Sequence, residues 1–261
     1  MPAPPVIYVF MGLLGLAVGS FLNVLIYRLP RNKKIIFERS VCPTCGKRIP
    51  AYLNIPVISY IILLGRCREC GSAISPRYPL VELLNAAIYV FFLSMDGISA
   101  QLAVHCFLTS ALLTIFFIDF EFQIIPDKIT LPGMIVGLAG SLFVDPPGMI
   151  NAGLGLVVGG GGLLLIAYLG EWLFKKEAMG GGDIKMAAMM GAFVGWQKVL
   201  LIFLGAALIG MVISLVWMVF SKQIRRERII PFGPFLAMAG LVVAGYGDQL
   251  LRFYINTFLA V

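Results

Sequence analysis

Charged residues are scarce in this sequence: Asp, Glu, Lys and Arg make up 13% of the chain, against about 25% in soluble globular domains. Hydrophobic residues make up 60%, and the mean hydropathy is +0.95. The sequence also lacks alternation between apolar and polar residues, because its apolar runs are continuous over helix-spanning lengths. These features exclude an ordinary soluble domain, disfavour a transmembrane β-barrel and indicate a helical integral membrane protein.

A removable signal peptide is also lacking. The apolar stretch 6–26 has no small-residue cleavage site ahead of a polar chain, so we expect it to be a retained first span. The fold class expected is an all-α polytopic membrane protein with about eight transmembrane helices, at residues 6–27, 79–95, 99–119, 129–144, 150–174, 183–196, 198–220 and 232–258. The shortest, 183–196, is expected to be half-inserted or sheltered by its neighbours.

Basic residues gather on one side of this topology. Of the 20 Lys and Arg residues, 17 lie in the connections 28–78, 120–128, 175–182 and 221–231. The positive-inside rule places these connections in the cytoplasm and the N-terminus outside. The net charge of +7 then reflects cytoplasmic loops, and no nucleic-acid partner is expected. The same orientation brings Asp119 and Asp183 to one level, near the cytoplasmic interface.

Four of the five cysteines form two Cys-x-x-Cys-Gly motifs, 21 residues apart, in the first basic loop. Cys42, Cys45, Cys67 and Cys70 have the spacing of a zinc ribbon, which predicts one structural Zn²⁺ per chain. Redox-active dithiols are the competing interpretation. We therefore expect three regions: a first helix at 1–29, a zinc-ribbon-like cytoplasmic loop domain at 30–78, and a helix bundle at 79–261.

Asp119 and Asp183 are the acids with the clearest chemical potential, because acidic residues within membrane segments are costly to desolvate and usually functional. Asp183 follows three glycines, and Gly180 and Gly182 are expected to leave room for a substrate backbone. Repulsion between two confined carboxylates favours keeping one protonated, which suits peptide hydrolysis by an acid–base pair. The residues alone leave a proton or cation relay equally open.

Six ordered motifs resemble the type 4 prepilin peptidase family. They comprise Gly19 to Pro30, the two cysteine motifs, Asn54-Ile55-Pro56, Ile74 to Glu82, Ile118-Asp119 with Ile125-Pro126-Asp127, and Gly180 to Lys185. The resemblance covers most of the chain. It implies that Asp119 and Asp183 match the two catalytic aspartates of a GxGD-type aspartic protease.

The resemblance also implies a function. Members of this family remove a short basic leader from type IV prepilins and pseudopilins at the cytoplasmic face of the bacterial inner membrane. They then N-methylate the new N-terminus with S-adenosylmethionine, whose site the sequence does not locate. Glu82, Glu121 and Asp127 are expected as contacts for the basic leader. Two other interpretations are weighed against this one: a transporter with an aspartate proton relay, and a membrane thiol oxidoreductase.

Overall fold

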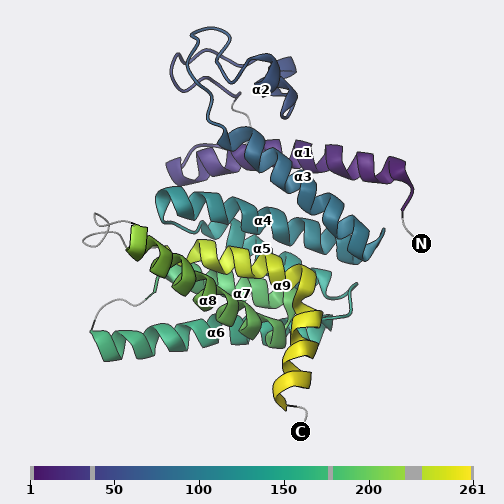
Figure 1. The fold of residues 1–261 in the computed structure, drawn as a ribbon, viewed down its shortest axis with the longest axis vertical. Helices are drawn as coiled ribbons and strands as arrows, with labels where there is room; N and C mark the ends of the chain where they lie inside the picture. The colour runs from purple at the N-terminus through teal and green to yellow at the C-terminus, as the bar shows by residue number, and fades with distance from the viewer. Residues whose placement is uncertain (1–2, 36–38, 176–178, 221–230, 260–261) are drawn as a thin grey trace. The chain divides into compact units, whose positions relative to one another are not determined.

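The computed structural model describes residues 3–35, 39–175, 179–220 and 231–259. The chain divides into two compact units, Met1–Leu102 and Ala103–Val261 (Figure 1). Regular structure in the described residues is helical, apart from two isolated β-bridges. The basic residues expected at Lys176 and within 221–230 lie outside these ranges. The three-part division at residues 29 and 78 stays a prediction.

The first unit is built on a pair of helices, α1 (Pro5–Arg28) and α3 (Arg77–Asp96). Two glycines of α1 allow a close approach. A Cβ at Gly15 would lie 2.6 Å from Cα of Ala86, and one at Gly19 would lie 2.7 Å from Cα of Glu82. Asn85 of α3 donates a side-chain hydrogen bond of 2.8 Å to the carbonyl of Gly15. The two helices therefore pack directly on each other.

A compact loop joins α1 to α3. It contains the short helices η1 (Leu29–Arg31), η2 (Ala51–Asn54) and α2 (Ile58–Ile62). Two isolated β-bridges, Val41 with Arg48 and Arg66 with Ala73, each close a turn around one Cys-x-x-Cys motif. This arrangement is zinc-ribbon-like, as predicted. The apolar residues 51–64 form the short helices η2 and α2, which are too short to cross a bilayer.

The second unit is a helix bundle. Its helices are α4 (Ala100–Phe122, beginning in the first unit), α5 (Asp127–Gly140), α6 (Gly148–Phe174), α7 (Gly181–Val194), α8 (Trp196–Phe220), α9 (Gly233–Tyr254) and the π-helical turn η3 (Ile255–Leu259). Helix α7 packs against α5, α6, α8 and α9. Every residue from Met186 to Val194 is buried. The expectation that this short helix is sheltered by its neighbours is therefore confirmed.

Glycines set the contact between α6 and α7. A Cβ at Gly155 would overlap the carbonyl oxygen of Gly191, and a Cβ at Gly159 would overlap that of Ala187. By contrast, a Cβ at Gly161 would meet nothing within 4 Å. The glycine-rich stretch of α6 thus serves close helix packing on one face.

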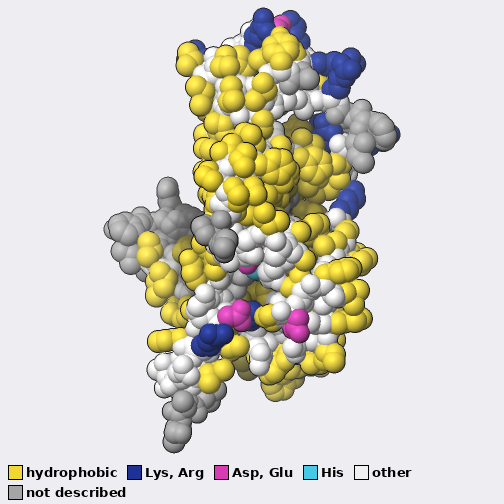
Figure 2. All heavy atoms as spheres, turned by 90° about the vertical axis from the view of Figure 1, so that its right-hand side faces the viewer, with side chains coloured by type: hydrophobic (Ala, Val, Ile, Leu, Met, Phe, Trp, Pro, Cys, Tyr) yellow, Lys and Arg dark blue, Asp and Glu magenta, His cyan; other side chains and the backbone are white. Residues whose placement is uncertain are grey.

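All eight expected spans contain a helix, so the all-α membrane fold is confirmed. Six of the described helices are long and apolar enough to cross a bilayer, and the chain is a multi-pass membrane protein. Helices α5 and α7 have 14 residues each. Helix α5 ends at Gly140, four residues before the expected boundary, because the chain turns at residues 141–143. Hydrophobic side chains cover much of the face in Figure 2, as expected for contact with lipid.

Candidate active site

Asp119 and Asp183 lie in one site of the second unit. Asp119 is near the C-terminal end of α4 and is 5% exposed, whereas Asp183 is in the first turn of α7. The charge of Asp183 acts directly on the carboxyl of Asp119. Packing within one bundle therefore brings together two acids that are 64 positions apart in the sequence, as the topology predicted.

The start of α7 fixes Asp183. Gly180 is the N-cap residue in an extended conformation, and Asp183 lies three residues further on. The Asp183 carboxylate accepts hydrogen bonds from the N–H of Gly180 and from its own N–H. This reach back to the N-cap is half of a capping box, and the helix dipole favours an anion there. The second carboxylate oxygen of Asp183, Oδ1, is buried without a hydrogen-bond partner among the described residues.

Asp119 is held by the start of a different helix, α9. The N–H of Gly233, the first residue of α9, donates a hydrogen bond to the Asp119 carboxylate. A Cβ at position 233 would overlap Oδ2 of Asp119, so only glycine allows this approach. Sequence reasoning missed this residue. The available signal was Gly233-Pro234 at the start of the last span, a typical helix-start pattern.

Ile125 packs between the two helix starts. A Cβ at Gly182 would lie 2.8 Å from Cβ of Ile125, and a Cβ at Gly233 would lie 3.1 Å from its Cδ1. Gly182 therefore makes room for Ile125. A Cβ at Gly180 would lie 3.2 Å from Oδ2 of Asp183, whereas a Cβ at Gly181 would meet no atom within 4 Å. The open space beside Asp183 is at Gly181, and the substrate-binding role of Gly180 and Gly182 stays a prediction.

An ion pair links α5 to α7 next to this site. Lys185 Nζ lies 2.8 Å from Oδ1 and 2.7 Å from Oδ2 of Asp127. Both side chains are about half exposed, so the pair contributes little to the free energy of unfolding. Its position matters more, because it joins the first turn of α5 to α7 two residues after Asp183.

The arrangement suits acid–base chemistry on a bound water. A buried carboxylate, Asp119, and a partly buried one, Asp183, share the site, and each is oriented by N–H groups at the N-terminus of a helix. A pair that shares one proton presents a base and an acid together. A water between them can lose a proton to one carboxylate while the other donates to a polarised carbonyl.

The four loop cysteines form a second cluster, in the first unit. The Sγ atoms of Cys42, Cys45, Cys67 and Cys70 all lie within 4.8 Å of one another. Those of Cys42 and Cys70 are 3.9 Å apart. A tetrahedral ion about 2.3 Å from each sulfur requires sulfurs about 3.8 Å apart. The cluster can therefore hold a metal ion with four thiolates.

Hydrogen bonds prepare part of this cluster for metal binding. The N–H of Cys45 is the main cause that lowers the pKa of Cys42 to about 6, with further help from Thr44 and Ser72. The Ser72 hydroxyl lowers the pKa of Cys70. The N–H of Lys47 lowers the pKa of Cys45, but desolvation and the neighbouring thiols outweigh it and raise that pKa to about 11. Thiolates are the metal-binding form, so two of the four ligands are predisposed.

Glu82 belongs to the first unit and not to the bundle that holds the aspartate pair. It is 7% exposed on α3. Its Oε2 accepts a hydrogen bond of 2.8 Å from the N–H of Val57, and the Ser20 hydroxyl also donates to it. Both donors are neutral, so within the described part of the chain this buried carboxylate has polar partners and no compensating cation.

Comparison with known proteins identifies relatives of both units. A family model described as the Bacterial Peptidase A24 N-terminal domain matches residues 13–95, and one described as the Type IV leader peptidase family matches residues 106–215. The chain is 37% identical to a prepilin leader peptidase/N-methyltransferase of Pseudomonas aeruginosa, over 94% of this chain and 92% of the relative. It is 34% identical to one of Aeromonas salmonicida, over 95% and 93% of the two chains. No solved structure gave a significant match.

Proposed function

The chain belongs to the type IV leader peptidase family, and from this premise we propose that it is a bifunctional prepilin-processing enzyme. In this proposal, the aspartate pair removes the basic leader from type IV prepilins and pseudopilins. The protein then N-methylates the new N-terminal residue, with S-adenosylmethionine as the methyl donor. It acts in the bacterial inner membrane, with the basic loop in the cytoplasm.

Asp119 and Asp183 are the catalytic residues of the peptidase in this proposal. One carboxylate removes a proton from water, and the resulting nucleophile attacks the scissile carbonyl. The other carboxyl donates its proton to the carbonyl oxygen, and the leaving amine is protonated as the C–N bond breaks. The titration belongs to the pair, so the acid and base roles are not divided between the two residues.

The observation that carries this proposal is the convergence of the buried carboxylate of Asp119 and the partly buried carboxylate of Asp183 on two helix N-termini, those of α9 and α7. Asp119→Asn and Asp183→Asn should each reduce cleavage of a co-expressed prepilin by about 10²–10⁴-fold. Asp248→Asn is the matched control, because Asp248 is an acid of the same unit paired with Lys198 at 2.9 Å. Cleavage that survives both aspartate changes would exclude the mechanism and favour the proton relay.

Substrate contacts follow from the surroundings of the pair. We propose that the scissile backbone passes Gly180 to Gly182, where Gly181 offers open space. Acids of the adjoining segment 121–127, Glu121 and Asp127, are the leader contacts proposed for its basic residues. Asp127 is held by Lys185, so a basic leader would meet an oriented carboxylate there.

Zinc is the metal proposed for Cys42, Cys45, Cys67 and Cys70. The sulfur spacing and the four-thiolate donor set support it. Four protein ligands leave no open coordination position, so the role of the ion is structural. It would tie the two turns of the loop together, because a loop of this size builds little apolar core of its own.

A further inference from the structure

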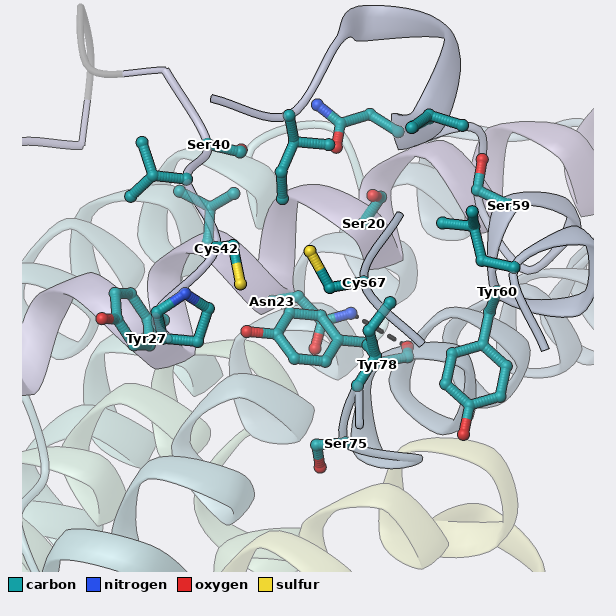
Figure 3. Close-up of a pocket in the computed structure, with 18 of the residues that line it drawn as sticks. Ser20, Asn23, Tyr27, Ser40, Cys42, Ser59, Tyr60, Cys67, Ser75 and Tyr78 are labelled. Carbon is teal, nitrogen blue, oxygen red and sulfur yellow. Dashed lines mark hydrogen bonds between the residues drawn. The ribbon is translucent and has the colours of Figure 1, made fainter. Parts of the chain in front are cut away.

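The first unit contains a cavity of about 1010 Å³ between the cytoplasmic loop and the adjoining ends of α1 and α3 (Figure 3). Its volume is at the top of the range of about 300–1,000 Å³ typical of small-molecule sites. Figure 3 shows Ser20 and Asn23 of α1, Tyr78 of α3 and Cys42 and Cys67 of the loop around it. The aspartate pair belongs to the other unit, and all the residues that line this cavity belong to the first.

Buried hydrogen-bond acceptors line the floor of the cavity. Asn23 is 2% exposed, and its Nδ2 donates to the carbonyl of Tyr78 at 3.0 Å. Its Oδ1 is buried without a partner among the described residues. The Glu82 carboxylate also lines the cavity, and its only donors in the described ranges are the neutral groups of Val57 and Ser20. Unsatisfied acceptors and a buried carboxylate are costly, and a cation that donates hydrogen bonds would offset the cost.

The rest of the lining carries the opposite charge. Eight of the lining residues are Lys or Arg, and the only other acid among them, Glu69, is paired with Lys47 at 2.6 Å. Four tyrosines also line the cavity: Tyr27, Tyr52, Tyr60 and Tyr78. Aromatic rings provide stacking surfaces for a base and attract a sulfonium or ammonium group.

From these features, we propose that this cavity binds S-adenosylmethionine, with Glu82 and Asn23 holding the ammonium of its amino-acid end. The basic lining suits the carboxylate of the same end, and the tyrosines suit the adenine. A nucleotide phosphate fits less well, because its charge would face the buried acceptors. This inference rests on the proposed methyl transfer, assigns Glu82 to the donor and leaves the basic leader to Glu121 and Asp127.

The cavity residues would position the donor for methylation. In the transfer, the lone pair of the free α-amine forms the N–C bond as the C–S bond breaks, its electron pair stays on sulfur, and the new ammonium releases a proton to water. Glu82 and Asn23 hold the amino-acid end and take no part in bond making. They are therefore binding residues, and their loss should appear in the dissociation constant of the donor.

The test measures binding to the purified full-length protein in detergent by isothermal titration calorimetry. Glu82→Gln should raise the dissociation constants of S-adenosylmethionine and S-adenosylhomocysteine by about tenfold to a hundredfold, because a charged hydrogen bond is lost. Binding of 5′-methylthioadenosine, which lacks the amino-acid end, should be unchanged. Asp96→Asn, at the last residue of the same helix, is the matched control and should bind all three as the wild type does.

Prepilin cleavage by the same preparations reports folding and tests the proposed function separately. Unchanged binding of 5′-methylthioadenosine reports that Glu82→Gln is folded, and Asp96→Asn should cleave as the wild type does. Unchanged S-adenosylmethionine affinity in Glu82→Gln, or equal weakening of 5′-methylthioadenosine, would overturn the assignment. A wild-type protein that cleaves prepilin but binds no S-adenosylmethionine would overturn the cavity's role alone, whereas loss of cleavage in the wild type would overturn the proposed peptidase.

Discussion

The position of Asp119 depends on one residue more than a hundred positions away. Gly233 donates its N–H to the carboxylate and has no side chain to obstruct it. The residue therefore supplies a hydrogen bond and the space that the hydrogen bond requires. Ile125 packs against Gly233 at the start of α9 and against Gly182 at the start of α7. Because the packing is close, a small movement of one helix start should also move the other.

Gly233→Ala should therefore damage catalysis more than folding. The added methyl group would overlap Asp119 Oδ2 and lie 3.1 Å from Cδ1 of Ile125, so the Asp119 carboxylate must leave its position. A displacement of this size costs about a hundredfold in rate. Initial rates of prepilin cleavage, normalised to folded protein, would measure it. Gly161→Ala adds the same methyl group in open space, and equal rates for the two variants would contradict the role given to Gly233.

Helix α7 is the element on which the bundle depends. It is only 14 residues long, yet nine consecutive residues are buried and its first turn carries Asp183. The contact with α6 is made by backbone against backbone at Gly155 and Gly191. A helix of this length is too short to reach both membrane interfaces, so close contacts with its neighbours hold it in place.

Gly155→Ala should destabilise the bundle by about 1–3 kcal/mol, because its methyl group must displace the backbone of α7. Thermal unfolding in detergent would show a lower melting temperature than for the wild type. Gly161→Ala, on the same helix, faces open space and should unfold at or above the wild-type temperature. Matching melting temperatures for the two variants would show that the α6–α7 contact is not tight.

The sequence predicted the helices well and their mutual contacts poorly. Continuous apolar runs located all eight ranges, and Cys-x-x-Cys spacing located the metal-binding cluster. The count of basic residues in the loops set the orientation of the spans, and that orientation placed Asp119 and Asp183 at the same level. Gly233 and Ile125 escaped, because their importance arises from helix ends that meet only after packing. The buried acceptor of Asn23 escaped for the same reason, since nothing local distinguishes it from a polar residue facing water.

At the scale of the whole molecule, the two units divide the two proposed activities. The aspartate pair belongs to the second unit, whereas the cysteine cluster and the cavity belong to the first. Cys42 and Cys67 line that cavity directly. The cysteine cluster is therefore part of the cavity wall, and the two activities should respond differently to its loss.

Cys42→Ser should lower metal affinity by about tenfold or more and reduce methylation of the cleaved pilin, while leader cleavage persists. Metal analysis of the wild type should find one zinc ion per chain. Mass spectrometry of the pilin N-terminus would separate cleaved from methylated product. Cys106→Ser, at a buried cysteine of α4, is the control and should retain the metal. If cleavage and methylation fall in parallel in Cys42→Ser, the ion supports the entire fold.

The direct packing of α1 on α3 also bears on how such a protein evolves. Gly15 and Gly19 meet the backbone of α3 without help from the intervening loop, and Asn85 closes the contact with a hydrogen bond. The loop therefore connects two helices that already contact each other directly. Loss or replacement of the loop would therefore leave this helix contact in place and remove only the methylation step proposed for the loop.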